Sequence, residues 1–372
     1  MNIQYDRLRV EPERIGLVIN ATENDISIDG ILTSDLVVKF FESASFKSEI
    51  SGGGLITRQL IAHLGGLQGA RVFKISGVRR LLKTYGPRSS FSKRAALAII
   101  GGKDPKNPTS DFSDHKQLYI EAREIGTDLT PSIVFSYLVE KGLLRIGVGL
   151  KCLSCNLTSW TPLDSLRQRN VCELCGNEYD ATRQLVCESF HYRRSGVLGL
   201  ERNAQGAIPV ALLLQQLQTS LGSIFQRSFF APSFDLRPIQ GMNLPVCEVD
   251  FVIVTSGLYP EKTSIIVGEC KDSGGAIDIR DVNNLRRVAD AFSEERFTAY
   301  IAFVKLSPFT SEEVTLISTL NGPYQQRVIM LTARELEPYH LYERTESEVG
   351  LELRSLSPAD LAQATSAIYP AP

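Results

Sequence analysis

Two apolar stretches in the C-terminal half carry charged residues of types that could bind a metal ion and hydrolyse a phosphodiester. The first, EVDFVIV over 248–254, contains Asp250, and the second, TSIIVGECK over 263–271, ends in Glu269, Cys270 and Lys271. Side chains alternate between the faces of a strand, so Glu269 and Lys271 are expected on the same side. If the two strands are neighbours, Asp250 reaches the same point. Charges at the end of a buried sheet need mutual pairing or a shared purpose.

Two carboxylates and an ammonium at one point are what phosphodiester hydrolysis needs. Oxygen ligands hold Mg²⁺, and such an ion polarises the phosphate and supplies a nucleophilic water. A lysine beside it orients that water or stabilises the developing negative charge. The alternative is an ion pair between Glu269 and Lys271 at the strand end, with Asp250 capping a loop.

The spacing of these residues resembles the PD-(D/E)xK, or restriction-endonuclease-like, nucleases. Eighteen residues separate Asp250 from the Glu269-Cys270-Lys271 run, and a helix and further strands follow. The order of helices and strands over residues 185–335 is also similar to that family's αβββαβ core. The resemblance implies that Asp250 and Glu269 bind Mg²⁺ or Mn²⁺, with the carbonyl of Cys270 as a further ligand, and that Lys271 is catalytic. Val249 departs from the family, which often has proline at this position.

Auxiliary residues and a biological role also follow from the resemblance. Glu248 is either an auxiliary acid or a residue at the strand entrance, and the first helix would contribute one of Gln215, Gln216 and Gln218. The resemblance implies an endonuclease, with DNA favoured as the substrate. Nucleases of this kind serve restriction and defence against phage, which leaves room for a protein partner in a multi-component system.

Four cysteines have the spacing of a zinc ribbon. Cys152 and Cys155 form one C-x-x-C pair, and after sixteen residues Cys172 and Cys175 form a second. Each pair makes a tight turn that directs two thiolates at one ion, and four thiolates close a tetrahedral structural Zn²⁺ site. The alternatives are an iron–sulfur cluster and disulfides. Paired cysteines in an odd total of seven favour a reducing compartment.

Hydrophobic periodicity predicts an α/β fold with a mixed central sheet flanked by helices, as in a restriction-endonuclease-like core. Helices are expected over 77–85, 208–221, 281–294 and 311–320, with Pro209 in a first turn, and strands over 248–254, 263–271, 297–304 and 327–331. Four regions are predicted: a basic α+β region of 1–127, a helix or winged-helix-like unit with the zinc ribbon over 128–180, a nuclease-like domain of 181–345, and a tail of 346–372.

Basic residues are concentrated in one segment. From Ser51 to Lys103 the chain has ten lysines and arginines and no acidic residue, although its net charge is -2. Such a segment is typical of a surface that binds a phosphate backbone. The alternative is a solvated face, or one paired with acids elsewhere. The run Ser51-Gly52-Gly53-Gly54 lacks the lysine of a nucleotide-binding loop and is expected to be flexible. The predicted nucleic-acid-binding residues are Arg71, Lys74, Arg79, Arg80, Lys83, Arg88, Lys93 and Arg94.

The overall composition is that of a globular protein, with 43% hydrophobic and 22% charged residues. No stretch approaches the ~20 apolar residues that span a bilayer, so no membrane partner and a cytoplasmic location are expected. The leading hypothesis is therefore a Mg²⁺-dependent DNA endonuclease with a structural zinc ribbon. Two alternatives stay open: a non-catalytic nucleic-acid-binding or scaffold protein with an inactive nuclease-like core, and a zinc-ribbon protein of the transcription type.

Overall fold

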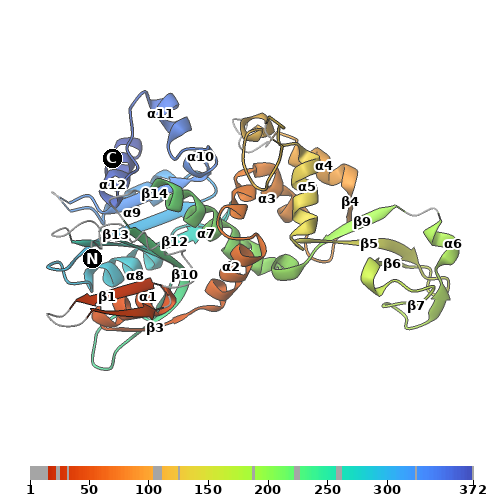
Figure 1. The fold of residues 1–372 in the computed structure, drawn as a ribbon, viewed down its shortest axis with the longest axis horizontal. Coiled ribbons are helices and arrows are strands. Elements are labelled where there is room, and N and C mark those ends of the chain that lie inside the picture. Colours follow the sequence, from red (N-terminus) through yellow and green to blue (C-terminus); the bar gives the residue numbers. More distant parts are fainter. Residues whose placement is uncertain are drawn as a thin grey trace. The chain divides into compact units, whose positions relative to one another are not determined.

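The chain divides into two compact units (Figure 1). The computed structural model describes residues 16–21, 26–31, 33–103, 111–124, 126–186, 189–221, 227–256, 262–322 and 325–370. Residues 1–58 and 206–372 form one unit, called here the sheet unit, and residues 59–205 form the other, the ribbon unit. The predicted boundaries after residues 127 and 180 both lie inside the ribbon unit. The first 58 residues join the C-terminal half because one of their strands completes its sheet.

A six-stranded mixed sheet is the centre of the sheet unit, in the order β14-β13-β12-β11-β10-β3. The pairs from β3 to β12 are antiparallel, and β12, β13 and β14 run parallel. This confirms the predicted mixed α/β sheet and its four expected strands, whereas β3 and β10 were not predicted. The strands are β3 (Phe46–Ile50), β10 (Arg227–Pro238), β11 (Cys247–Ser256), β12 (Thr263–Lys271), β13 (Phe297–Lys305) and β14 (Val328–Thr332).

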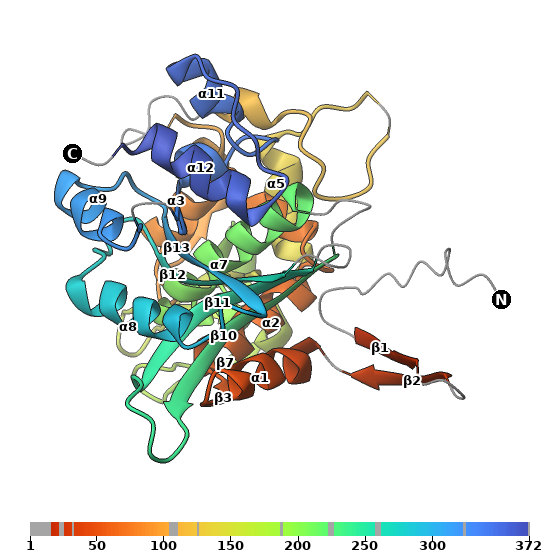
Figure 2. The same ribbon diagram turned by 90° about the vertical axis from the view of Figure 1, so that its left-hand side faces the viewer.

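Helices cover both faces of this sheet (Figure 2). On one face lie α1 (Thr33–Ser43), α8 (Ile279–Asp290) and α9 (Ser311–Ser318), which bury a core with the strands. That core contains Phe41 of α1, Val252 of β11, Val267 of β12 and Leu285 of α8. Helices α7 (Glu201–Ser220) and α12 (Pro358–Ile368) lie on the opposite face.

Two expectations about helices are wrong. Helix α7 begins at Glu201, so Pro209 lies inside it and not in its first turn. The predicted C-terminal tail contains α11 (Glu343–Val349) and α12, which packs against β14. Ser357 and Asp360 form a capping box at the start of α12, and the Thr365 hydroxyl accepts a hydrogen bond from the Met330 amide at 3.0 Å. The remaining elements are α10 (Ala333–Leu336) and a hairpin of β1 (Gly16–Ala21) and β2 (Ile26–Ile31).

The ribbon unit combines a helical part with two small sheets. One sheet has the order β4-β9-β5-β6, and β7 and β8 form the other. The expected helix over 77–85 is confirmed as α3. The elements of the ribbon unit are η2 (Gly69–Lys74), α3 (Ser76–Thr84), β4 (Phe91–Ser92), α4 (Lys93–Ile100), η3 (Phe112–His115), α5 (Pro131–Glu140), β5 (Leu144–Lys151), β6 (Thr158–Pro162), η4 (Leu163–Ser165), β7 (Arg169–Val171), β8 (Glu178–Asp180), α6 (Thr182–Leu185), β9 (Phe190–Arg194) and η5 (Gly196–Gly199).

The boundary between the two units falls inside one helix. Helix α2 (Gly52–His63) begins in the sheet unit and ends in the ribbon unit. Among the described residues, no helix is long and apolar enough to cross a membrane.

Candidate active site

The pairing of β11 with β12 determines where the candidate carboxylates lie. These strands are antiparallel with Phe251 opposite Gly268, and one further step in this register corresponds to Asp250 opposite Glu269. Directly opposite residues project from one face, so both carboxyl groups lie on the face that α8 covers. Gly268 permits this close pairing, because a Cβ atom there would be 2.3 Å from the Phe251 ring and 2.5 Å from the Ala302 carbonyl oxygen.

The three predicted site residues are brought together at this point. The Asp250 Oδ2 atom accepts a hydrogen bond of 2.7 Å from the backbone amide of Cys270, which lies between the other two. The Lys271 Nζ atom is 2.6 Å from the Glu269 Oε1 atom. The side chains of Glu269 and Lys271 are 16% and 24% exposed, so the site is partly screened from water yet reachable.

A fourth group, Asp281, was missed by the sequence reasoning. Its Oδ2 atom is 3.3 Å from the Lys271 Nζ atom, so the ammonium contacts two carboxylates. Asp281 is held by the capping box at the start of α8, where its carboxylate accepts a hydrogen bond from the Asp278 amide. The D-x-x-D spacing of Asp278 and Asp281 was a readable signal for a helix start, but not for a contact with Lys271.

Glu248 adds another carboxylate, two residues before Asp250 on the same strand. The Ser51 hydroxyl donates a 2.6 Å hydrogen bond to its Oε1 atom. Ser51 also caps α2, because its Oγ atom accepts a hydrogen bond from the Gly54 amide at 3.0 Å. The expectation of a flexible glycine loop here is therefore wrong: residues 52–54 are the first turn of a helix, and Gly54 packs directly on the Ser233 carbonyl.

Burial makes this group of carboxylates electrostatically unusual. It raises the pKa of Asp250 to about 6, against the hydrogen bond from the Cys270 amide. It raises the pKa of Glu269 to about 8, and the nearby charge of Asp250 contributes to that rise. Burial alone would lower the pKa of Lys271, but the Glu269 and Asp281 carboxylates outweigh it and raise that pKa. Strongly shifted carboxyl groups in a partly open position are typical of functional sites.

Carboxylate oxygens are the ligand type that a hard divalent cation prefers, although among the described residues three or more metal-ligand side chains converge only at the four cysteines. The Lys271 ammonium contacts Glu269 and Asp281, and Asp250 interacts with it electrostatically. The raised pKa values of Asp250 and Glu269 show that Lys271 does not compensate them fully. A cation with oxygen ligands would supply the missing positive charge.

The three candidate glutamines do not join this group. Gln215 and Gln216 are buried, and Gln218 is half-buried, on α7. That helix covers the face of the sheet opposite α8 (Figure 2). Because side chains alternate along a strand, Asp250 and Glu269 share the α8 face with Val252 and Val267. The Gln215 amide instead contacts Thr219 of its own helix at 3.3 Å.

The predicted basic surface separates into structural and exposed residues. Lys74 is 1% exposed, and Arg80 donates hydrogen bonds to the carbonyls of Ile99 and Gly102 at the C-terminal end of α4. Arg79 likewise donates to the Phe73 and Lys74 carbonyls, and Arg71 is half-buried. Half of the predicted residues thus contribute to the fold of the ribbon unit. The exposed ones are Lys83, Arg88, Lys93 and Arg94.

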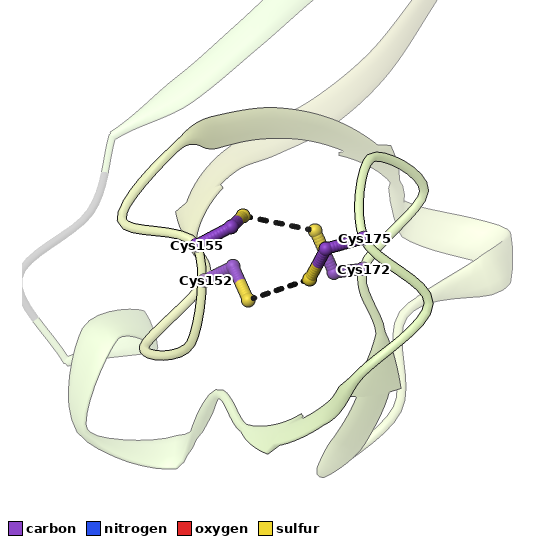
Figure 3. Close-up of side chains that lie close together, drawn as sticks. All are labelled: Cys152, Cys155, Cys172 and Cys175. Carbon is purple, nitrogen blue, oxygen red and sulfur yellow. Dashed lines mark hydrogen bonds between the residues drawn. The ribbon is translucent and has the colours of Figure 1, made fainter.

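The four cysteines of the ribbon converge as predicted (Figure 3). Their Sγ atoms all lie within 4.8 Å of one another, with 3.6 Å between Cys152 and Cys175 and 3.7 Å between Cys155 and Cys172. Four thiolates at ~2.3 Å from a tetrahedral ion would be about 3.8 Å apart, so this set could hold a structural metal such as zinc. The backbone amide of Cys155 is the main cause that lowers the pKa of Cys152 to about 6.

Each cysteine pair is held in a tight knuckle. The residues after the pairs, Asn156 and Gly176, have φ angles of 60° and 75°. Asparagine and glycine tolerate this left-handed conformation, which lets their amides return to the carbonyls of Cys152 and Cys172. The buried apolar cluster beside the knuckles is small, consisting of Val148, Leu150, Cys152, Cys172, Tyr179 and Ala181.

Comparisons with known proteins do not assign the chain to a family. No family model matches it, and no curated protein matches it. Among solved structures, it is similar to one described as the crystal structure of protein VC1899 from Vibrio cholerae, with 14% sequence identity and a TM-score of 0.34. The match covers 85% of this chain and 61% of that one. A TM-score this low carries no argument about fold or function.

Proposed function

We propose that this protein is a metal-dependent endonuclease that hydrolyses phosphodiester bonds of nucleic acid, with DNA as the favoured substrate. The observation that carries the proposal is the meeting of Asp250, Glu269 and Lys271 at one point of β11 and β12. Two carboxyl groups with raised pKa values and a lysine form a donor set suited to a divalent cation and an anionic substrate.

In this proposal each side chain has a defined role. Asp250 and Glu269 hold Mg²⁺ or Mn²⁺, and the Cys270 carbonyl is the further candidate ligand. When bound, the ion supplies Lewis-acid polarisation of the phosphate and a nucleophilic water at neutral pH. Lys271 donates hydrogen bonds to the substrate phosphate or to the attacking water. The Cys270 amide fixes the Asp250 carboxylate, so one of its oxygens is oriented before any ligand arrives.

The distribution of charge between the two units supports a nucleic acid as substrate. The sheet unit has 19 basic and 29 acidic residues, a net charge of -10, whereas the ribbon unit has 21 basic and 13 acidic residues, a net charge of +8. An acidic catalytic unit repels a polyanion, so affinity must come from elsewhere in the chain. The exposed Arg88, Lys93 and Arg94 of the ribbon unit are the residues we assign to phosphate contacts.

The ribbon cysteines are proposed to hold Zn²⁺ with a purely structural role. Four protein thiolates leave no open coordination position for a water or a substrate. The small apolar cluster beside the knuckles is too limited to hold this part of the chain together alone, so the metal would supply much of its folding free energy.

The test is cleavage of supercoiled plasmid and of single-stranded DNA and RNA in Mg²⁺ or Mn²⁺. Asp250→Asn and Lys271→Met should each reduce the rate by at least about 100-fold, the range expected when a group that stabilises the transition state is removed. Asp290→Asn is the matched control, because Asp290 pairs with Arg327 on the same sheet unit and should leave the rate unchanged. Cleavage that survives both site substitutions would contradict the proposal.

One observation favours a second candidate function, a non-catalytic nucleic-acid-binding or scaffold protein. Lys271 already pairs with Glu269 and Asp281, as a lysine would in a nuclease-like core that only maintains its fold. That candidate predicts nucleic-acid binding that depends on Arg88, Lys93 and Arg94, with no cleavage under any metal. Binding and cleavage measured on the same preparation separate the two.

A further inference from the structure

The Lys271 ammonium contacts two carboxylates, and only one of them is a proposed metal ligand. Its distances are 2.6 Å to the Glu269 Oε1 atom and 3.3 Å to the Asp281 Oδ2 atom. A tight pair between Lys271 and Glu269 competes with any cation for the same carboxylate oxygen. A second anion in contact with the ammonium would weaken that competition.

Asp281 is fixed in a way that suits this task. Its carboxylate accepts a hydrogen bond from the Asp278 amide, and its own amide donates to the Asp278 carboxylate, so the capping box of α8 restricts its rotation. Its side chain is 21% exposed, comparable to the 24% of Lys271. A mobile surface acid would not hold an ammonium, whereas a capped one can.

The aliphatic part of the Lys271 side chain packs against the backbone of the turn that follows β12. At Gly275, a Cβ atom would lie 2.9 Å from the Lys271 Cβ atom and 3.3 Å from its Cγ and Cδ atoms. The glycine therefore lets the turn after β12 pack directly on the stem. This packing restricts the side chain, so the ammonium has a short range of positions in contact with the Glu269 and Asp281 carboxylates.

We infer that Asp281 is a positioning residue of the proposed site, which draws the Lys271 ammonium away from Glu269 and so frees that carboxylate for the metal. This inference rests on the proposed function, because it assumes that Glu269 is a metal ligand. Asp281 itself acts through Lys271 and does not ligate the metal.

Asparagine is the informative substitution at this position. Asp281→Asn keeps a side-chain oxygen that can accept the Asp278 amide, so the capping box persists, and it removes the charge that holds Lys271. The Lys271 ammonium then pairs with Glu269 alone. The expected result is Mn²⁺ affinity about fivefold to tenfold lower than in the full-length wild type, a coupling of the size found between neighbouring charged groups. Asp281→Glu should restore part of the affinity.

Calorimetric Mn²⁺ titration, without nucleic acid, gives a readout independent of cleavage. A double-mutant cycle with Lys271→Met separates positioning from ligation. If Asp281 acts through the ammonium, Asp281→Asn changes Mn²⁺ affinity less than about twofold when Lys271 is already methionine. A loss of equal size in both backgrounds would mean that Asp281 ligates the ion, and would overturn the inference.

Asp290→Asn is the matched control for charge removal on α8, since Asp290 pairs with Arg327 away from Lys271. Thermal unfolding of each variant checks that the capping box has survived. If wild-type protein neither binds Mn²⁺ nor cleaves nucleic acid, the proposed function fails. If wild type does both and Asp281→Asn binds Mn²⁺ as tightly, only the role of Asp281 is refuted.

Discussion

Replacing Glu269 by glutamine is expected to stabilise the protein in the absence of divalent cations, while it removes a proposed metal ligand. Burial raises the pKa of Glu269 from 4.5 to about 8, so the folded state binds this proton more tightly than the unfolded state. Stability then falls as the pH rises from about 4.5 to about 8, because ionisation is penalised only in the folded protein. Glutamine keeps the shape of the protonated acid and escapes this penalty.

The magnitude follows from the pKa, which already includes the favourable 2.6 Å contact with Lys271. A rise from 4.5 to about 8 corresponds to about 5 kcal/mol at about 1.4 kcal/mol per pH unit once the carboxyl group is fully ionised. At pH 8 the carboxyl group of the folded protein is about half ionised, so the expected gain is about 4 kcal/mol. At pH 5 this group is protonated in the folded protein and ionises only in the unfolded chain, so the gain should fall below about 1 kcal/mol.

The measurement is urea unfolding at pH 5 and at pH 8, followed by far-ultraviolet circular dichroism in buffer without Mg²⁺ or Mn²⁺. The single tryptophan, Trp160, lies in the ribbon unit, so its fluorescence provides an internal control that should not respond to a change at Glu269. Glu295→Gln, at an exposed position of the sheet unit, is the matched variant and should leave stability unchanged at both pH values. A variant that is less stable than wild type at pH 8, or equally stabilised at both pH values, would refute the reasoning.

Three further predictions concern other parts of the chain. Removing metal with a chelator, or substituting Cys152→Ser, should unfold the ribbon and shift Trp160 fluorescence emission to longer wavelength. The shift is expected because Trp160 packs on Gly147 and its ring lies 4.7 Å from the Arg193 guanidinium in the folded ribbon. Cys247→Ser, outside the cysteine cluster, should leave the emission unchanged. Glu313→Gln should destabilise the protein by about 3 kcal/mol in urea unfolding at pH 7, because it leaves Lys305 buried without its partner at 2.8 Å. Burial would raise the pKa of Glu313, but Lys305 and backbone amides lower it. This stabilisation is therefore present above pH 4.5 and is lost as the pH falls through the depressed pKa. If the free energy of unfolding of the variant falls at acid pH as steeply as that of the wild type, this account is contradicted. Reversing Arg88, Lys93 and Arg94 to glutamate should weaken DNA binding and reduce its salt dependence in fluorescence anisotropy, and equal affinity at low salt would remove this surface from the proposal.

The local spacing of apolar residues predicted the strands and helices from β11 to β14 well. The strands β11, β12, β13 and β14 and the helices α8 and α9 follow from apolar spacing within ten or so residues, and Asp250, Glu269 and Lys271 could be found on them. The cysteine knuckles were equally readable, because C-x-x-C followed by asparagine or glycine encodes the turn itself. In each case the signal and the structure it specifies lie in the same short segment.

Long-range pairing could not be predicted in this way. Strand β3 pairs with β10 across more than 170 residues, with Ile50 opposite Phe234, and this pairing puts the N-terminal residues into the sheet unit. The contacts of Ser51 with Glu248 and of Asp281 with Lys271 depend on where whole helices begin in space. The capping pattern of Asp278 and Asp281 marks the start of α8, but it does not identify Lys271 as the partner of Asp281 across the fold.

The sheet offers its own comparison between a structural ion pair and the candidate site. Lys271 and Lys305 stand opposite each other at the ends of the parallel strands β12 and β13. Lys305 contacts both oxygens of Glu313 at 2.8 Å, and amides of Ile277 and Thr310 donate to the same carboxylate, whose pKa is lowered despite its burial. Lys271 instead faces carboxyl groups of which two have raised pKa values. A strand-end ion pair is already present at Lys305, so the raised pKa values of Asp250 and Glu269 support the proposal that these two carboxyl groups bind a cation.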